Sequence, residues 1–182
     1  MTGKPGDWRG EVLRFWFGLE PEQHWKADDT LDHRIREQFH DLWAEQRRLP
    51  AECFLGNALT ALAGVILFDQ FPRNMFRGHA EQFATDPLAL AIATAAVELG
   101  LDEELDRGER PFLYMPFEHS ERIADQKRSL LLFTKLGDDH LLGYAKKHHD
   151  VIERFGRFPH RNLMLGRAPR PAEIAAGDVT PF

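Results

Sequence analysis

Cysteine is nearly absent from this sequence, which holds Cys53 alone among 182 residues. A single cysteine cannot form a disulfide within the chain. A chain of this length also needs no such staple, because it can bury roughly 70% of the surface that its extended form exposes. The cysteine content therefore favours a reducing compartment.

Long apolar runs and an excess of basic residues are missing as well. No stretch reaches the roughly 18 consecutive apolar residues of a membrane-spanning helix, and the first residues lack the apolar core of a signal peptide. We therefore expect a soluble, cytoplasmic protein with no membrane partner. The 23 Lys and Arg face 29 Asp and Glu, a net charge of −6, which argues against a nucleic-acid partner.

Three familiar chemical motifs are also absent. There is no Gly-x-Ser-x-Gly nucleophile elbow, no Gly-rich phosphate loop and no His-Glu-x-x-His zinc motif. His149 and Glu153 have the four-residue spacing that lets two ligands share a helix face, but spacing fixes no third ligand. We expect no cofactor and no metal site.

The apolar residues recur at helical spacing, and no segment alternates as a strand does. Caps, prolines and glycines then bound the expected segments, which cover residues 8–17, 30–48, 52–70, 88–99, 111–115, 117–136, 140–155 and 171–176. The sequence predicts an all-α fold of roughly eight or nine helical segments. It predicts one domain over residues 1–182, with loose ends at about 1–7 and 178–182. The helix pairs could form a closed bundle or a short α-solenoid.

Two stretches share an unusual polar pattern. The first Phe-Pro motif, residues 69–78, reads Asp-Gln-Phe-Pro-Arg-Asn-Met-Phe-Arg-Gly, and the second, residues 157–167, reads Arg-Phe-Pro-His-Arg-Asn-Leu-Met-Leu-Gly-Arg. We expect Pro72 to end the preceding helix and to push Phe71 away from helical dihedrals. Our hypothesis is that the two motifs face one site or one structural knot.

The polar residues of these motifs, with those near the end of the 140–155 helix, are candidates for binding an anion. A guanidinium fork matches two oxygens of a carboxylate or phosphate. The candidate binding residues are Asp69, Arg73, Asn74, Arg77, His148, Arg154, Arg157, Arg161 and Asn162. In the alternative interpretation the arginines only offset helix-end carbonyls and pair with acids as a structural clamp.

Glu118, His119 and His160 are the candidate catalytic residues. Imidazole titrates near neutrality, and a neighbouring carboxylate can complete an acid–base pair. We expect Pro116 to interrupt the helix just before Glu118, so that a new helix starts at Phe117. The competing interpretation is a buried imidazole that bonds to a backbone carbonyl.

Three long motifs occur in order along the chain: residues 69–78, residues 114–121 (Tyr-Met-Pro-Phe-Glu-His-Ser-Glu) and residues 154–162 (Arg-Phe-Gly-Arg-Phe-Pro-His-Arg-Asn). Together they resemble the signature of the bacterial domain of unknown function 924 family. The resemblance covers nearly the whole chain and implies a tetratricopeptide-like all-α fold without an established activity. After Gly166 the sequence departs from the family, which usually continues toward Ser-Thr-Pro-Glu-Glu, so the resemblance implies no role for the C-terminal segment.

The resemblance also implies which polar residues belong to the family motif. They are Asp69, Arg73, Asn74, Arg77, Glu118, His119, Gln126, His148, Arg154, Arg157, His160, Arg161 and Asn162. Three functions stay open at this point. The chain could bind an anionic small molecule or a peptide, it could be a metal-independent hydrolase or lyase that uses Glu118 and His119 as acid and base, or its polar clusters could be purely structural.

Overall fold

A computed structural model describes residues 6–180 of the chain, and all regular structure in that range is helical. The all-α prediction is confirmed. The outermost parts of the ends predicted to be loose, residues 1–5 and 181–182, lie outside the described residues. The chain divides into two compact units, unit 1 up to Leu113 and unit 2 from Tyr114 onward. The single domain stays a prediction, because two compact units can belong to one domain.

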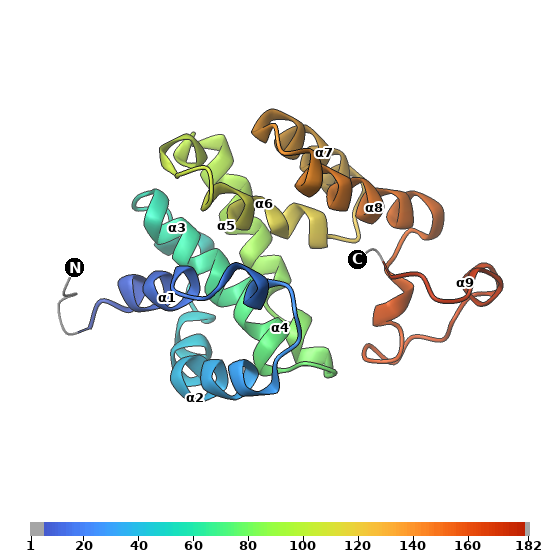
Figure 1. Cartoon of the computed structure of the whole chain (residues 1–182), viewed down its shortest axis with the longest axis horizontal. Helices are drawn as coiled ribbons and strands as arrows, with labels where there is room; N and C mark the ends of the chain where they lie inside the picture. The colour runs from blue at the N-terminus through green and yellow to red at the C-terminus, as the bar shows by residue number, and fades with distance from the viewer. Residues whose placement is uncertain (1–5, 181–182) are drawn as a thin grey trace. The chain divides into compact units, whose positions relative to one another are not determined.

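Unit 1 holds the N-terminal helices, drawn from blue to green in Figure 1. Its helices are α1 (Trp8–Phe17), α2 (Asp29–Gln46), α3 (Ala58–Val65), α4 (Phe71–Met75) and α5 (Asp86–Glu98), with a π-helix, η3 (Ile66–Gln70), between α3 and α4. Short 3-10 turns occupy Pro21–His24, Ala51–Phe54, Ala80–Phe83 and Leu101–Glu104. Within the unit, α3 packs against α1 and α5, and α2 packs against α4.

Local signals explain where several of these helices begin. The side chain of Asp28 accepts from the backbone N–H groups of Thr30 and Leu31 and so caps α2. The predicted continuous helix over residues 52–70 is wrong, because Asn57 caps a new start for α3 by accepting from Thr60 N at 2.9 Å. The buried run from α3 to α4 is the centre of unit 1, where Phe71 and Phe39 lie 4.6 Å apart between ring centroids.

The first Phe-Pro motif does not end its helix as predicted. Phe71 has φ −60° and ψ −40°, which are helical, and α4 starts there with Pro72 in its first turn. The reason is the π-helix, in which Phe71 N–H bonds to the carbonyl of Ile66 five residues back. Pro72 cannot donate to the carbonyl of Phe68, and the hydroxyl of Thr85 donates to that carbonyl instead, at 2.7 Å.

Unit 2 consists of the end of α6 (Arg110–His119), α7 (Ile123–Leu136), α8 (Asp139–Phe155), a 3-10 turn η6 (Pro159–Arg161) and α9 (Pro171–Ala176). The helices α7 and α8 lie side by side as a hairpin (Figure 1). Gly137 ends α7 and Gly156 ends α8, with φ of 72° and 68°, a conformation that favours glycine. Both helices therefore end where the sequence predicted, at residues 136 and 155.

Pro116 does not break the chain where the sequence predicted. The helix α6 continues through it to His119, and the break comes at residues 120–122. Two carbonyls of this break, those of Glu118 and Ser120, accept from the buried amide of Gln126 at 2.6 and 2.7 Å. A side chain from α7 therefore satisfies the orphan carbonyls at the end of α6.

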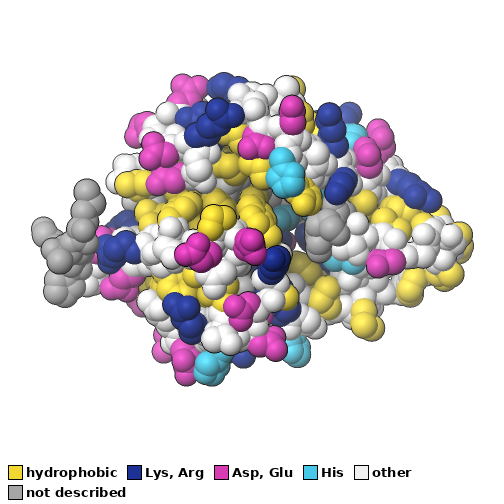
Figure 2. All heavy atoms as spheres, in the orientation of Figure 1, with side chains coloured by type: hydrophobic (Ala, Val, Ile, Leu, Met, Phe, Trp, Pro, Cys, Tyr) yellow, Lys and Arg dark blue, Asp and Glu magenta, His cyan; other side chains and the backbone are white. Residues whose placement is uncertain are grey.

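Among the residues that the structure describes, no helix is both long and apolar enough to cross a lipid bilayer. On the face drawn in Figure 2, basic and acidic side chains are interspersed, and apolar side chains show between them. The described residues of this face thus present charges of both signs.

Candidate functional site

Arg73, in the first Phe-Pro motif, lies between two carboxylates of unit 1. Its Nη1 is 3.1 Å from Oδ1 of the fully buried Asp69, and it donates to Asp86 through Nη1 at 2.8 Å and Nη2 at 3.0 Å. Burial alone would lower the pKa of Arg73, but the two carboxylates outweigh it and raise that pKa. Arg73 is therefore held as a partly buried, charged fork.

Asn74 and Arg77 share a third carboxylate, that of Asp32 on α2. The amide of Asn74 donates to Oδ1 at 2.8 Å, and Arg77 donates through Nε at 2.6 Å and Nη2 at 2.9 Å. The hydrogen bond to Asp32 is the main reason why the pKa of Arg77 is raised. We call these three residues the first carboxylate clamp, which joins α2 to the end of α4.

Unit 2 contains a second carboxylate clamp of the same composition, made of Glu173, Arg157 and Asn162. Arg157 donates to Glu173 through Nε at 2.6 Å and Nη2 at 2.8 Å, and the Asn162 amide donates at 2.9 Å. The hydrogen bond from Arg157 is the foremost reason why the pKa of Glu173 falls to about 2. The C-terminal segment, for which the family resemblance implied no role, supplies the acid of this clamp.

Arg167, the last residue of the second Phe-Pro motif, bonds to Glu121 in the loop before α7. It donates to Glu121 through Nη1 at 2.7 Å and Nη2 at 3.0 Å, and Glu121 also accepts from Phe158 N–H at 2.7 Å. Burial raises the pKa of Glu121, but the bonds from Arg167 and Phe158 outweigh it and lower that pKa. The motif is thus fixed at both of its ends.

Glu118 and His148, two of the candidate site residues, form a buried pair. Nδ1 of His148 lies 2.9 Å from Oε1 of Glu118 and 2.9 Å from the carbonyl of Tyr144, and both side chains are more than nine-tenths buried. Because a carboxylate and a carbonyl only accept, Nδ1 carries the proton. In neutral His148 the lone pair is then on Nε2.

His119, His160 and Arg161 lie near this pair. The ring centroids of His119 and His148 are 6.1 Å apart, and Arg161 donates to the carbonyl of His119 at 3.0 Å. His160 lies 5.6 Å from the ring of Phe158. Burial, followed by the charge of Arg161, lowers the pKa of His160 to about 4. His160 is therefore neutral at physiological pH, a state suited to accepting a proton or to packing.

Arg154 and His149 also lie on α8, and the side chain of His149 is only 14% exposed. Arg154 is exposed, and its guanidinium lies 4.7 Å from the ring centroid of its neighbour Phe155. The ligand atoms of His149, Asp150 and Glu153 lie within 4.8 Å of one another. The structure thus adds Asp150 to the pair whose spacing the sequence had shown, but exposed acidic groups commonly gather without a metal.

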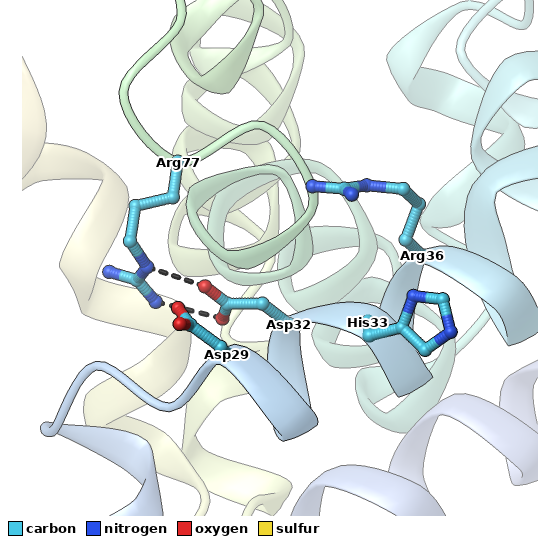
Figure 3. A pocket seen from close by; sticks show the side chains of 5 residues that line it. All are labelled: Asp29, Asp32, His33, Arg36 and Arg77. Atoms are coloured by element: carbon cyan, nitrogen blue, oxygen red, sulfur yellow. Dashed lines mark hydrogen bonds and ion pairs between the residues drawn. The ribbon is translucent and has the colours of Figure 1, made fainter.

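A pocket of about 360 Å³ lies entirely within unit 1. It is lined by Asp29, Asp32, His33, Arg36 and Arg77 (Figure 3). The first four occupy one face of α2, because residues three, four and seven positions apart on a helix point the same way. Of the candidate binding residues, only Arg77 lines it.

The two arginines that line this pocket, Arg36 and Arg77, are each held in place by hydrogen bonds. Arg36 donates through both Nε and Nη2 to the carbonyl of Met75, near the end of α4, and Arg77 is held by Asp32. The Nη1 groups of these two arginines donate to no residue within the described range 6–180. In Figure 3, Asp29 and Arg77 lie on one side and Arg36 and His33 on the other.

The sequence missed several acids and one arginine that these contacts require. They are Asp32, Glu173 and Arg36, together with the pairing role of Asp86. A signal existed for Asp32, since it precedes the buried Ile35 and Phe39 by three and seven positions and so lies on the apolar face of α2. An acid on such a face needs a partner. For Arg36 and Glu173 we find no comparable signal in the sequence.

Comparison with known proteins finds one family and one similar solved structure. Residues 12–176 match the family described as "Bacterial protein of unknown function (DUF924)". The similar structure is that of a protein of unknown function from Agrobacterium tumefaciens. It is 38% identical, with a TM-score of 0.87, and the match covers 95% of this chain and 98% of that one. The search of curated proteins finds no match.

Proposed function

We propose, from the premise that this chain belongs to the bacterial DUF924 family, that it is a binding protein for an anionic small molecule or peptide. The observation that carries the proposal is the pocket on α2, where Arg36 and Arg77 line a space of about 360 Å³ from opposite sides (Figure 3). That volume lies at the low end of the roughly 300–1,000 Å³ typical of ligand pockets. A carboxylate is the anionic group that we assign to it.

The chemistry of the two arginines supports this assignment. Each is fixed by hydrogen bonds from Nε and Nη2, to Met75 O or to Asp32, so little side-chain entropy is left to lose on binding. Each Nη1 can then donate to a ligand oxygen, and charge-assisted bonds of this kind are the stronger ones. Arg73, by contrast, uses both of its Nη groups on Asp69 and Asp86.

Thermal-shift and calorimetric titration with a panel of carboxylates would test the proposal, with Arg36→Gln as the variant. Loss of one charge-assisted hydrogen bond costs about 1.5–3 kcal/mol, so the Kd should rise roughly tenfold or more. Arg34→Gln is the matched control, because it removes the same charge from the same helix and its guanidinium lies over Phe15, outside the pocket. If no carboxylate binds, or if both variants bind as the wild type does, the proposal is wrong.

A second candidate is a metal-independent hydrolase or lyase, and the contact between Glu118 and His148 favours it. A carboxylate that orients an imidazole is an arrangement used in general acid–base catalysis, and His119 lies beside this pair. The hypothesis predicts a turnover that His119→Ala and His148→Asn both abolish while circular dichroism shows intact folding. Turnover that survives either substitution would exclude this role.

A further inference from the structure

Asp29 and Asp32 line the same pocket but differ in burial and in hydrogen bonding. Asp32 is buried and accepts three hydrogen bonds, from Asn74 and Arg77. Asp29 is exposed, and its side chain bonds to no residue within the described part of the chain. The two lie side by side at the start of α2 (Figure 3). The pocket therefore holds one carboxylate that is available to a ligand.

Once the Asp32–Arg77 ion pair is set aside, the pocket still presents both signs of charge. Asp29 supplies a negative charge, Arg36 supplies a positive charge, and the Nη1 group of Arg77 adds a second donor. The charge of Asp29 also acts on Arg77, whose pKa it helps to raise after the bond to Asp32. A purely anionic ligand would meet the repulsion of Asp29, because like charges in a partly enclosed site are unfavourable.

We infer that the ligand of this pocket carries an ammonium group as well as a carboxylate, as a free amino acid or a short peptide does. Asp29 accepts from the ammonium, and Arg36 and Arg77 donate to the carboxylate. This inference rests on the proposed function and names the ligand class of the same pocket. It is also the arrangement in which every charged group of the pocket has a partner of opposite sign.

Asp29 has a structural explanation too, which the experiment must separate from binding. An acid in the first turn of a helix interacts favourably with the positive end of the helix dipole. Asp29→Asn should therefore lower the stability of the ligand-free protein slightly. This loss of stability is measured without ligand. A role in binding is measured separately, as the ratio of the Kd values of one variant for a ligand with and a ligand without the ammonium group.

The experiment measures Kd by calorimetry for matched ligands that differ in the ammonium group alone. The probes are L-alanine against propionate, L-glutamate against glutarate, and dipeptides against their des-amino analogues. Wild-type protein should bind at least one ammonium-bearing member roughly tenfold or more tightly than its partner. Asp29→Asn should remove that preference, and Glu45→Gln, the same charge change on an exposed residue of α2 outside the pocket, should keep it.

The other outcomes distinguish a failure of this inference from a failure of the proposed function. If the wild type binds carboxylates without preferring the ammonium-bearing member, or if Asp29→Asn keeps the preference, the inference is wrong and the proposed function stands. If no member of any pair binds, the proposed function and the inference both fail. A preference for dipeptides over free amino acids would identify the source of the ligand as peptide.

Discussion

The two Phe-Pro motifs have nearly the same sequence but different backbones. In the first, Phe71 is helical and a π-helix carries the chain into α4. In the second, Phe158 is extended, with φ −88° and ψ 107°, and a single 3-10 turn follows it. The difference lies in what precedes each proline, because Gly156 has already ended α8 two residues before Phe158. A Phe-Pro pair therefore does not specify one conformation.

Despite this difference, the two motifs build the same contact. In each, an asparagine amide and an arginine fork hold one buried carboxylate, Asp32 in the first clamp and Glu173 in the second. Identical groups thus reach identical chemistry from different backbones. In the first motif the clamp also borders the pocket, because Asp32 and Arg77 line it together with Arg36 and Asp29.

The largest effect is expected for Asp69→Ala. This substitution removes a fully buried carboxylate from Arg73 and from the amide of Gln70. Breaking a buried ion pair typically costs about 3–5 kcal/mol of unfolding free energy. Chemical denaturation would measure the loss, with the exposed Asp41→Ala as the control. A loss as small as that of the control would show that Asp86 alone satisfies Arg73.

The next effect concerns a contact that only the first motif needs. Thr85→Val keeps the shape of the side chain but removes the hydroxyl that donates to Phe68 O and accepts from Trp43 Nε1. Leaving two buried polar groups unsatisfied should cost roughly 2–4 kcal/mol. Thermal denaturation would report this loss. An unchanged Tm would mean that the π-helix does not depend on Thr85.

A matched pair of substitutions tests whether the clamps are equivalent. Asn74→Ala and Asn162→Ala each remove the amide donor from a buried carboxylate, and each should cost about 1.5–3 kcal/mol. Asn162 also accepts from Arg167 at 3.0 Å, so its loss should be the larger of the two. Urea denaturation of both variants in parallel would measure the difference. A negligible cost for either one would break the equivalence.

The smallest effect is expected from His160, which has no counterpart between proline and arginine in the first motif. Its pKa in the folded protein is about 4, below the ordinary 6.5, so between these values only the unfolded chain binds the proton. Stability should therefore fall as the pH is lowered from 6.5 toward 4, by less than about 2 kcal/mol at pH 5. Denaturation of His160→Gln should show a shallower fall. An identical pH profile would contradict the lowered pKa.

The sequence alone determined the features that depend on neighbouring residues. Helical spacing established the all-α class, and the predicted helix ends at residues 136 and 155 agree with the glycine caps Gly137 and Gly156 of α7 and α8. These signals are readable because a cap or a left-handed glycine acts on its own turn. The three family motifs were readable for the same reason, since each is a continuous stretch.

Only the tertiary structure decided how the polar residues pair and where the prolines sit. Asp32 meets Asn74 and Arg77 across more than forty positions, and local pattern cannot choose among the 29 acids that could have filled that role. Pro72 stays within a helical run because Thr85, from the start of α5, satisfies the carbonyl that the proline cannot. In both cases the partner is distant in the sequence. A buried polar group requires a hydrogen bond wherever in the chain its partner lies, and local patterns do not show that partner.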